Sequence, residues 1–288
     1  MVWLVLTAAG IAIVWWGMFS THRVLHPLPR TITAPSTRHA VTAVPFLSRD
    51  GTAFEGWRVD APAPRGVVLA FHGYYANHRQ LLGVADGLAQ RGYVTLLFDL
   101  RGHGARSGSS TFGPGDLHDA EAILSWRSRQ PSLTSLPLGL LGFSFGGAVA
   151  CEAMGRFPEA SALVLDSTYA RFFPILARTI RLRYHLPVPF AWVTWLSTQL
   201  AVKRSLARVD PVVLAARCDR PLLLIHGGDD RTVPTDQARQ LYEAWRGPKQ
   251  LWMEPQAVHV GTYGLDPARY CDRLADFFDR WLLAESPS

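Results

Sequence analysis

Cysteine is scarce in this 288-residue sequence, and the few cysteines form no recognisable pattern. Cys151, Cys218 and Cys271 are odd in number and widely spread along the chain. Such a set predicts neither a disulfide framework nor a metal site, and we interpret it as buried packing in a reducing compartment. The H-E-x-x-H zinc motif and the phosphate-binding P-loop are also missing, so we expect neither a metal nor an organic cofactor.

Acidic residues are missing from one long stretch. Between Ser167 and Val209 the chain has no acidic residue and seven basic ones: Arg171, Arg178, Arg181, Arg183, Lys203, Arg204 and Arg208. Subtracting these seven charges from the net charge of +6 leaves −1 for the rest of the chain, so the basic character is local. No nucleic-acid-binding motif accompanies it, and we expect no nucleic-acid partner.

Charged side chains are absent from the N-terminal segment. Val2 to Ser20 is apolar and aromatic, and a helix of this length nearly matches a bilayer core of about 30 Å. Trp15 and Trp16 suit a membrane interface. A cleaved signal peptide is the alternative, but no basic region precedes the segment and no small-x-small cleavage site follows it. We predict a transmembrane anchor over residues 1–21 rather than a buried core helix, because the segment is apolar on all sides.

The residues after the predicted anchor indicate its orientation. Arg23, Arg30 and Arg38 follow the segment, and no basic residue precedes it. The positive-inside tendency then places the globular part on the cytoplasmic side. Residues 22–40 are rich in proline and threonine and are predicted to be a linker. The expected localisation is therefore a membrane, contacted through a single N-terminal helix.

Residues 41–288 are long enough for one large domain, in a chain with 48% hydrophobic residues. Short apolar runs alternate with helical patterns, which predicts an α/β fold whose mostly parallel sheet is flanked by helices. The Asp50-Gly51 pair between the first two runs predicts a hairpin. The predicted strands are 41–47, 54–59, 66–71, 93–98, 138–141, 162–165, 222–225 and 250–253, and the predicted helices include 80–90, 114–129, 235–245 and 267–283.

Residues 168–209 break this alternation. The stretch is aromatic and basic, and it lies between a strand that ends at Asp166 and one that ends at His226. A structureless loop of this length is implausible inside a compact domain. We predict a helical insertion that acts as a lid over one end of the sheet. An insertion that merely covers the sheet, with its arginines in solvent, is the alternative.

A G-x-S-x-G motif provides a candidate nucleophile. Gly142-Phe-Ser144-Phe-Gly146 follows an apolar run and precedes a small-residue helical stretch. In the order strand, motif, helix, the serine sits on a strained turn with its hydroxyl clear of the sheet, and a Cβ at either glycine would crowd that turn. The alternative is a glycine-rich turn whose serine only caps a helix.

A serine hydroxyl needs an adjacent base, and the base needs an orienting carboxylate. The carboxylate candidate is Asp230, with Asp229 as the alternative, because it follows a strand at the sheet edge where open α/β folds place their sites. The base candidate is His259, which follows the last predicted strand. A turn-forming aspartate and a surface histidine are the alternative interpretations. For His72, His103 and His226, each followed by glycine, we expect structural hydrogen bonds.

An oxyanion formed at the serine would need hydrogen-bond donors. The backbone amide of Phe145, directly after the serine, is one candidate. The backbone amide of Tyr74, in the loop after the strand that ends at His72-Gly73, is the other. Each such donor typically changes turnover by about 10²–10³.

From about Val41 to Leu283 the chain resembles the α/β-hydrolase superfamily, in the branch of monoacylglycerol lipases, lysophospholipases and serine aminopeptidases. The matching segments are His72-Gly-Tyr74, Asp99-Leu-Arg-Gly-His-Gly104 with Ser107 and Gly108, Gly142 to Gly147, His226-Gly-Gly-Asp-Asp-Arg-Thr-Val-Pro234 and His259. The resemblance implies Ser144 as nucleophile, Asp230 as orienting residue, His259 as base and a structural role for the Asp99 turn. The order serine, aspartate, histidine agrees with this fold. The setting Ala257-Val-His-Val-Gly261 departs from the family's usual one and leaves the fine positioning of the histidine open.

Together these features predict a membrane-anchored serine hydrolase of carboxylic esters that forms an acyl-enzyme. The aromatic, basic insertion suggests a small-molecule ester or acyl-lipid substrate, since basic groups favour anionic lipid. Two alternatives remain open: a serine aminopeptidase of the same fold, and a non-catalytic membrane-bound binding module. The sequence does not specify the oligomeric state.

Overall fold

The computed structural model describes residues 2–28, 31–106 and 108–283, with only the backbone described for residues 2–6 and 9. Eight strands form one sheet in the order β1-β2-β4-β3-β5-β6-β7-β8. The first two strands pair antiparallel with each other, β2 pairs antiparallel with β4, and every later pair is parallel. The strands are β1 (Val41–Leu47), β2 (Ala53–Val59), β3 (Gly66–Phe71), β4 (Tyr93–Phe98), β5 (Leu138–Phe143), β6 (Ala160–Asp166), β7 (Leu222–Gly227) and β8 (Lys249–Glu254).

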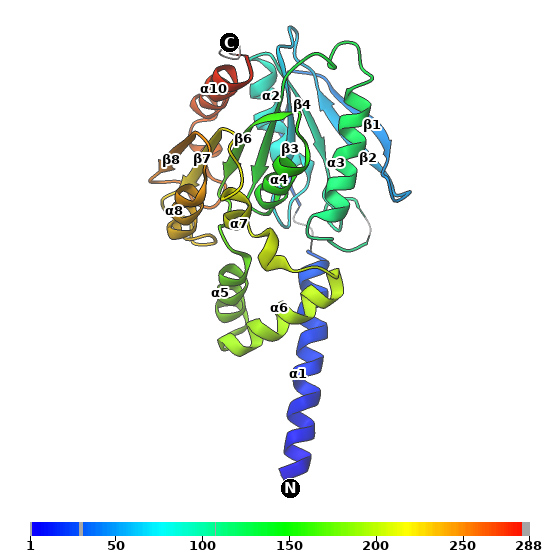
Figure 1. Ribbon diagram of the computed structural model, residues 1–288, viewed down its shortest axis with the longest axis vertical. Helices are drawn as coiled ribbons and strands as arrows, with labels where there is room; N and C mark the ends of the chain where they lie inside the picture. The colour runs from blue at the N-terminus through cyan, green and yellow to red at the C-terminus, as the bar shows by residue number, and fades with distance from the viewer. Residues whose placement is uncertain (1, 29–30, 107, 284–288) are drawn as a thin grey trace.

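Helices cover both faces of the sheet, which confirms the predicted architecture (Figure 1). One layer contains α3 and α4, and the other contains α2 and α10, which pack against each other. Around the sheet lie η1 (His78–Leu81), α2 (Leu82–Ala89), α3 (Pro114–Arg127), α4 (Phe145–Arg156), α7 (Pro211–Ala215), α8 (Thr235–Ala244), α9 (Thr262–Leu265), α10 (Pro267–Phe278) and the π-helical turn η3 (Asp279–Leu283).

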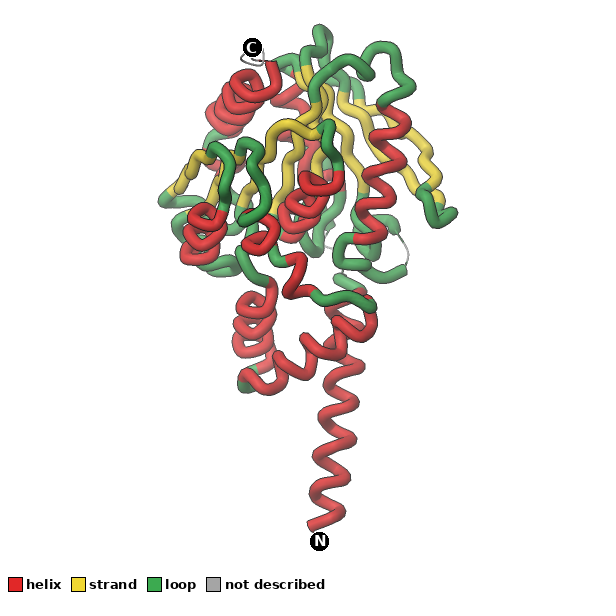
Figure 2. Tube along the Cα trace, viewed as in Figure 1, coloured by secondary structure: helices red, strands yellow, loops and turns green. Residues whose placement is uncertain are grey.

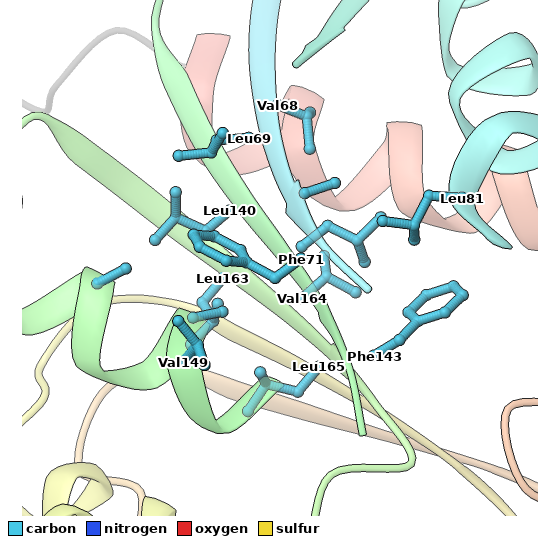
Figure 3. Close-up of a cluster of buried hydrophobic side chains, with 14 of the residues drawn as sticks. Val68, Leu69, Phe71, Leu81, Leu140, Phe143, Val149, Leu163, Val164 and Leu165 are labelled. Carbon is cyan, nitrogen blue, oxygen red and sulfur yellow. The ribbon is translucent and has the colours of Figure 1, made fainter. Parts of the chain in front are cut away.

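The central parallel strands form the core. Every residue of β3, β4, β5 and β7 is buried, because helices shield both faces of these strands. Figure 3 shows Leu69, Leu140 and Leu163 from adjacent strands packed together with Phe71, and Val149 of α4 closing the cluster from one side. The continuous apolar runs of the sequence are therefore explained by burial on both faces.

Between β6 and β7 the chain makes a helical insertion. It contains α5 (Phe172–Tyr184), α6 (Val188–Val202) and η2 (Leu206–Val209), which fall within the predicted range 168–209. Figure 1 shows α5 leaving the body of the molecule and α6 crossing to the N-terminal helix α1 (Val2–Leu25). The tube in Figure 2 shows the same arrangement and the N-terminal part of α1 projecting beyond it. Whether this insertion moves as a lid stays a prediction.

The predicted membrane anchor is contradicted. Within the part of the chain that the structure describes, no helix is long and apolar enough to cross a membrane, which overturns the predicted membrane localisation and membrane contact. The last turns of α1 instead face protein. Gly17, Ser20 and Thr21 lie against α6, where Thr21 Oγ1 is 2.6 Å from Ser197 Oγ. In the last turns of α1, the uncharged surface that suggested a lipid contact therefore packs against another helix.

Candidate active site

Ser144 occupies the sharp turn between β5 and α4. Its backbone is in a strained conformation, with φ 52° and ψ −115°, and its amide donates to the Asp166 carbonyl at 2.8 Å. The flanking glycines are required sterically. A Cβ on Gly142 would lie 2.5 Å from Gly147 Cα, and one on Gly146 would overlap the His72 carbonyl oxygen. The turn thus holds Ser144 at the end of a central strand, as the motif predicts.

The structure brings Ser144, His259 and Asp230 together from three distant parts of the chain. His259 Nε2 lies 2.9 Å from Ser144 Oγ, and His259 Nδ1 lies 2.7 Å from Asp230 Oδ2. The Asp230 side chain is fully buried, whereas that of His259 is 24% exposed. A ring that donates Nδ1–H to Asp230 leaves its Nε2 lone pair for the serine proton, which is the arrangement of a general base.

Asp230 is fixed by its own turn. Its Oδ1 accepts hydrogen bonds from the amides of Thr232 and Val233, at 2.9 and 2.8 Å. The alternative carboxylate, Asp229, is exposed and pairs with Arg231 at 3.2 Å. Backbone donors therefore hold Asp230 with its second oxygen aimed at His259, and Asp229 takes no part in this contact.

A second set of side chains supports the loop that carries His259, and no sequence motif predicted it. Val260, with φ 54°, donates its amide to Ser167 Oγ at 3.0 Å. Ser167 Oγ donates to one oxygen of Asp166 at 2.9 Å, and Tyr270 Oη donates to the other at 2.8 Å. Burial raises the pKa of Asp166 to about 6. This chain of polar contacts, two of them fully buried, links the end of β6 to the histidine loop.

The loop after β3 presents the other proposed oxyanion donor. Gly73 donates its amide to Gln80 Oε1 at 2.8 Å, which fixes the loop just before Tyr74. Among the described residues, neither the Tyr74 amide nor the Phe145 amide donates to a protein oxygen. The rings of the two residues meet edge to face, with centroids 5.7 Å apart. Both amides are therefore available near the serine.

The expected structural histidines make backbone hydrogen bonds. His72 donates Nδ1–H to the Gly73 carbonyl at 2.8 Å and accepts the Leu100 amide on Nε2 at 2.9 Å. Burial lowers its pKa to about 4, so the ring is neutral at pH 7. His103 and His226 donate to backbone carbonyls at 2.9 Å each.

The Asp99 turn behaves as the structural element that the resemblance implies. Asp99 Oδ1 accepts the His78 amide at 2.7 Å, and the turn leads into Arg101, which contacts Asp119. Ser107, one of the segments that carried the resemblance, lies outside the described residues. No group of three or more metal-binding side chains occurs among the residues placed by the structure.

A cavity of about 240 Å³ opens onto Ser144 and His259. Its walls are mainly apolar and come from the Tyr74 loop, from α5 and from the end of α1. The volume lies slightly below the roughly 300–1,000 Å³ of sites for drug-sized ligands. The contribution of α1 was not predicted, because residues 1–21 were assigned to a membrane anchor and residues 22–40 to a linker.

Two bacterial proteins illustrate the sequence relatives of this chain. The chain is 27% identical over 228 residues to the uncharacterized protein YfhR of Escherichia coli K12, covering 77% of this chain and 74% of the relative. It is 28% identical over 279 residues to the uncharacterized protein Rv2307c of Mycobacterium tuberculosis H37Rv, covering 94% and 91%.

A solved structure and a protein family extend the comparison. The fold is similar to an esterase of Pyrococcus furiosus, with a TM-score of 0.73, 24% identity and coverage of 90% of this chain and 98% of the esterase. Residues 62–219, more than half of the chain, match the family described as "Serine aminopeptidase, S33". The chain therefore belongs to this family of α/β hydrolases.

Proposed function

We propose that the protein hydrolyses carboxylic esters through an acyl-enzyme, with Ser144 as nucleophile, His259 as general base and Asp230 as the residue that orients the histidine. The observation that carries this proposal is the continuous hydrogen-bonded chain from Ser144 Oγ through the His259 ring to Asp230, at the opening of an apolar cavity. Such a chain activates a hydroxyl that is otherwise a poor nucleophile.

The chemical steps follow from the positions of these atoms. His259 Nε2 takes the proton of Ser144 as Oγ forms a bond to the ester carbonyl carbon, and the Tyr74 and Phe145 amides stabilise the oxyanion. The carbon–oxygen bond to the alcohol then breaks, and His259 gives its proton to the departing alkoxide. Water, deprotonated by His259, attacks the acyl group, and the acid leaves as Ser144 regains its proton.

The cavity walls favour an ester over a peptide. Ile175, Leu176 and Ile180 supply an apolar surface suited to an acyl chain, and we propose that α5 and α6 form the lid over it. An aminopeptidase needs a group for the substrate amine, often a carboxylate, and none of the described cavity residues is acidic. Aminopeptidase action is the second candidate, because the family description names it.

Labelling with a fluorophosphonate probe tests the proposal. The wild type should label and should hydrolyse 4-nitrophenyl esters, whereas Ser144→Ala should do neither. Ser161→Ala is a matched control, because Ser161 is exposed at the start of β6, whereas Ser144 follows the end of the neighbouring parallel strand β5. A wild-type protein that folds but never labels would support a non-catalytic binding module. Release of aminomethylcoumarin from aminoacyl amides without ester hydrolysis would support the peptidase.

A further inference from the structure

The cavity wall includes the last turn of the N-terminal helix. Ser20, Arg23 and Val24 of α1 line the same cavity as Ser144 and His259. Tyr74 Oη donates to the Val24 carbonyl at 2.6 Å, so α1 is tied to the residue whose amide faces the proposed oxyanion. The end of α1 therefore forms part of the wall of the cavity that opens onto Ser144.

Side-chain hydrogen bonds fix the position of this helix. Trp16 donates its indole N–H to the Phe190 carbonyl of α6 at 3.0 Å, and Thr194 donates to Ser20 Oγ at 2.8 Å. The backbones approach closely at Gly17, where a Cβ would lie 3.3 Å from Val193 Cγ1. Because these contacts lie within two turns of Arg23, they place its backbone firmly at the cavity wall.

Another part of the cavity wall is one face of α5. Ile175, Thr179 and Arg183 recur at the four-residue spacing of a single helical stripe and all line the cavity. Phe172 begins this stripe, and its ring lies 5.2 Å from that of Phe112. Arg183 is eleven residues further on, about 16 Å along the axis. The stripe therefore passes from aromatic through aliphatic to cationic with distance from the sheet.

Two guanidinium groups at this cavity have no acidic partner. Neither Arg23 nor Arg183 forms an ion pair within residues 2–28, 31–106 and 108–283. By contrast, Arg204 of the same insertion pairs with Glu152 at 2.8 Å. A guanidinium at a partly apolar site binds carboxylate or phosphate through charge-assisted hydrogen bonds.

We propose that the cavity takes esters that carry an anionic group, a carboxylate or a phosphate, and that Arg23 and Arg183 bind this group while the ester carbonyl lies at Ser144. The inference rests on the proposed ester hydrolysis and adds a substrate class to it. The aliphatic part of the α5 stripe contacts the hydrocarbon between the two ends of the substrate. Figure 1 shows the two elements involved, α5 and the C-terminal part of α1, joined by α6.

A matched pair of chromogenic esters tests this assignment. The 4-nitrophenyl hemiester of adipic acid and 4-nitrophenyl hexanoate have acyl parts of equal carbon number but differ in a terminal carboxylate. The wild type should favour the hemiester in kcat/KM by about tenfold or more, as a charge-assisted hydrogen bond would give. Arg23→Gln and Arg183→Gln should each lower the ratio of hemiester to hexanoate by about tenfold. Added salt should weaken the wild-type preference.

Arg181→Gln is the matched control, because Arg181 is exposed on α5 and does not line the cavity. It should leave the ratio at the wild-type value. A third substrate, 4-nitrophenyl 6-phosphonohexanoate, carries a phosphonate in place of the carboxylate. Comparing its kcat/KM with that of the adipate hemiester shows which anionic group the protein prefers. The proposal would be overturned if the wild type hydrolysed the adipate hemiester and 4-nitrophenyl hexanoate at equal rates. It would also be overturned if the ratio of kcat/KM for the two esters were the same in all variants.

A binding measurement separates this failure from failure of the proposed function. Calorimetry with Ser144→Ala protein should detect tighter binding of the adipate hemiester than of 4-nitrophenyl hexanoate. Arg23→Gln in that background should abolish this difference in affinity. If 4-nitrophenyl hexanoate is hydrolysed in a Ser144-dependent way without any preference for the anionic ester, the proposed esterase activity stands and the proposed anion site is wrong. If the anionic ester binds more tightly but no ester is hydrolysed, the anion site stands and the proposed esterase activity is wrong.

Discussion

The proposed catalytic residues and the proposed substrate wall are held in different ways. Ser144, Asp230 and His259 lie at the ends of β5, β7 and β8, and backbone amides or buried polar groups fix their turns. In α5, by contrast, Leu176 and Ile180 are the buried residues, and Leu182 is 59% exposed. The sheet edge therefore positions the proposed catalytic residues, whereas helices with fewer buried side chains form the proposed substrate wall.

This difference has an energetic consequence. Segments with few buried apolar contacts open at lower free energy than core strands, so α5 and α6 should open before the sheet does. A change at the sheet edge should alter turnover or global stability. A change in α1, α5 or α6 should alter substrate preference. Each of the following variants tests that division, in order of expected effect.

Replacing Asp230 by Asn should have the largest effect, a loss of about 10⁴ in kcat, because an amide would select the wrong tautomer of His259. The measurement is kcat on 4-nitrophenyl acetate, with the folded state checked by circular dichroism. Asp229→Asn is the neighbouring control, since Asp229 is exposed and pairs with Arg231. Equal losses in the two variants would contradict the assignment of the carboxylate.

Replacing His72 by Asn tests the sheet edge through pH. The pKa of His72 is lowered by burial from 6.5 to about 4 in the folded protein. Between these values the unfolded chain binds more protons, so wild-type stability is fully present above pH 6.5 and is lost as pH falls towards 4. The free energy of unfolding of the wild type should fall relative to that of the variant by up to about 3 kcal/mol over this window. Urea titrations at pH 7, 6, 5 and 4 measure it, and parallel curves would contradict it.

Much of the sheet and its edge could be predicted from the sequence, because their determinants are local. The apolar runs of β3 and β4 begin and end where predicted, since double-sided burial demands continuous hydrophobicity. The glycines around Ser144 encode a steric requirement of one turn. The approach of Asp230 and His259 to Ser144 follows from parallel strands that end at the same edge.

The α1 wall could not be predicted, because its determinants are pairwise. Trp16 and Ser20 look like membrane residues until Phe190 and Thr194 are placed beside them. Ser167 carried no motif, although it accepts the Val260 amide. An uncharged helix has the same composition whether lipid or another helix covers it, so composition alone could not decide between the two.

Removing the hydroxyl of Ser167 should reduce kcat by about 10- to 100-fold. Ser167→Ala leaves the partly buried Val260 amide without its acceptor, at a cost of about 1 kcal/mol, and loosens the loop that carries His259. Because Ser167 acts through that loop, the loss should appear in kcat with KM nearly constant. Ser167→Cys keeps a weak acceptor of similar size without a β-branched side chain at this positive φ of 55°, and it should retain part of the activity. A rise in KM with kcat unchanged would instead assign Ser167 to the substrate wall.

Enlarging Gly17 should have the smallest effect and change selectivity without changing the chemistry. A leucine there meets Val193 and Ser197 and pushes α1 away from α6, at a strain of about 1–3 kcal/mol. We expect KM for 4-nitrophenyl hexanoate to rise several-fold, while kcat/KM for the acetate, which does not reach the α1 wall, stays within twofold. Gly10→Leu is the control, because nothing lies within 4 Å of a Cβ at that position. If Gly17→Leu slowed both esters equally, α1 would support the catalytic residues themselves, and the division between sheet edge and substrate wall would fail.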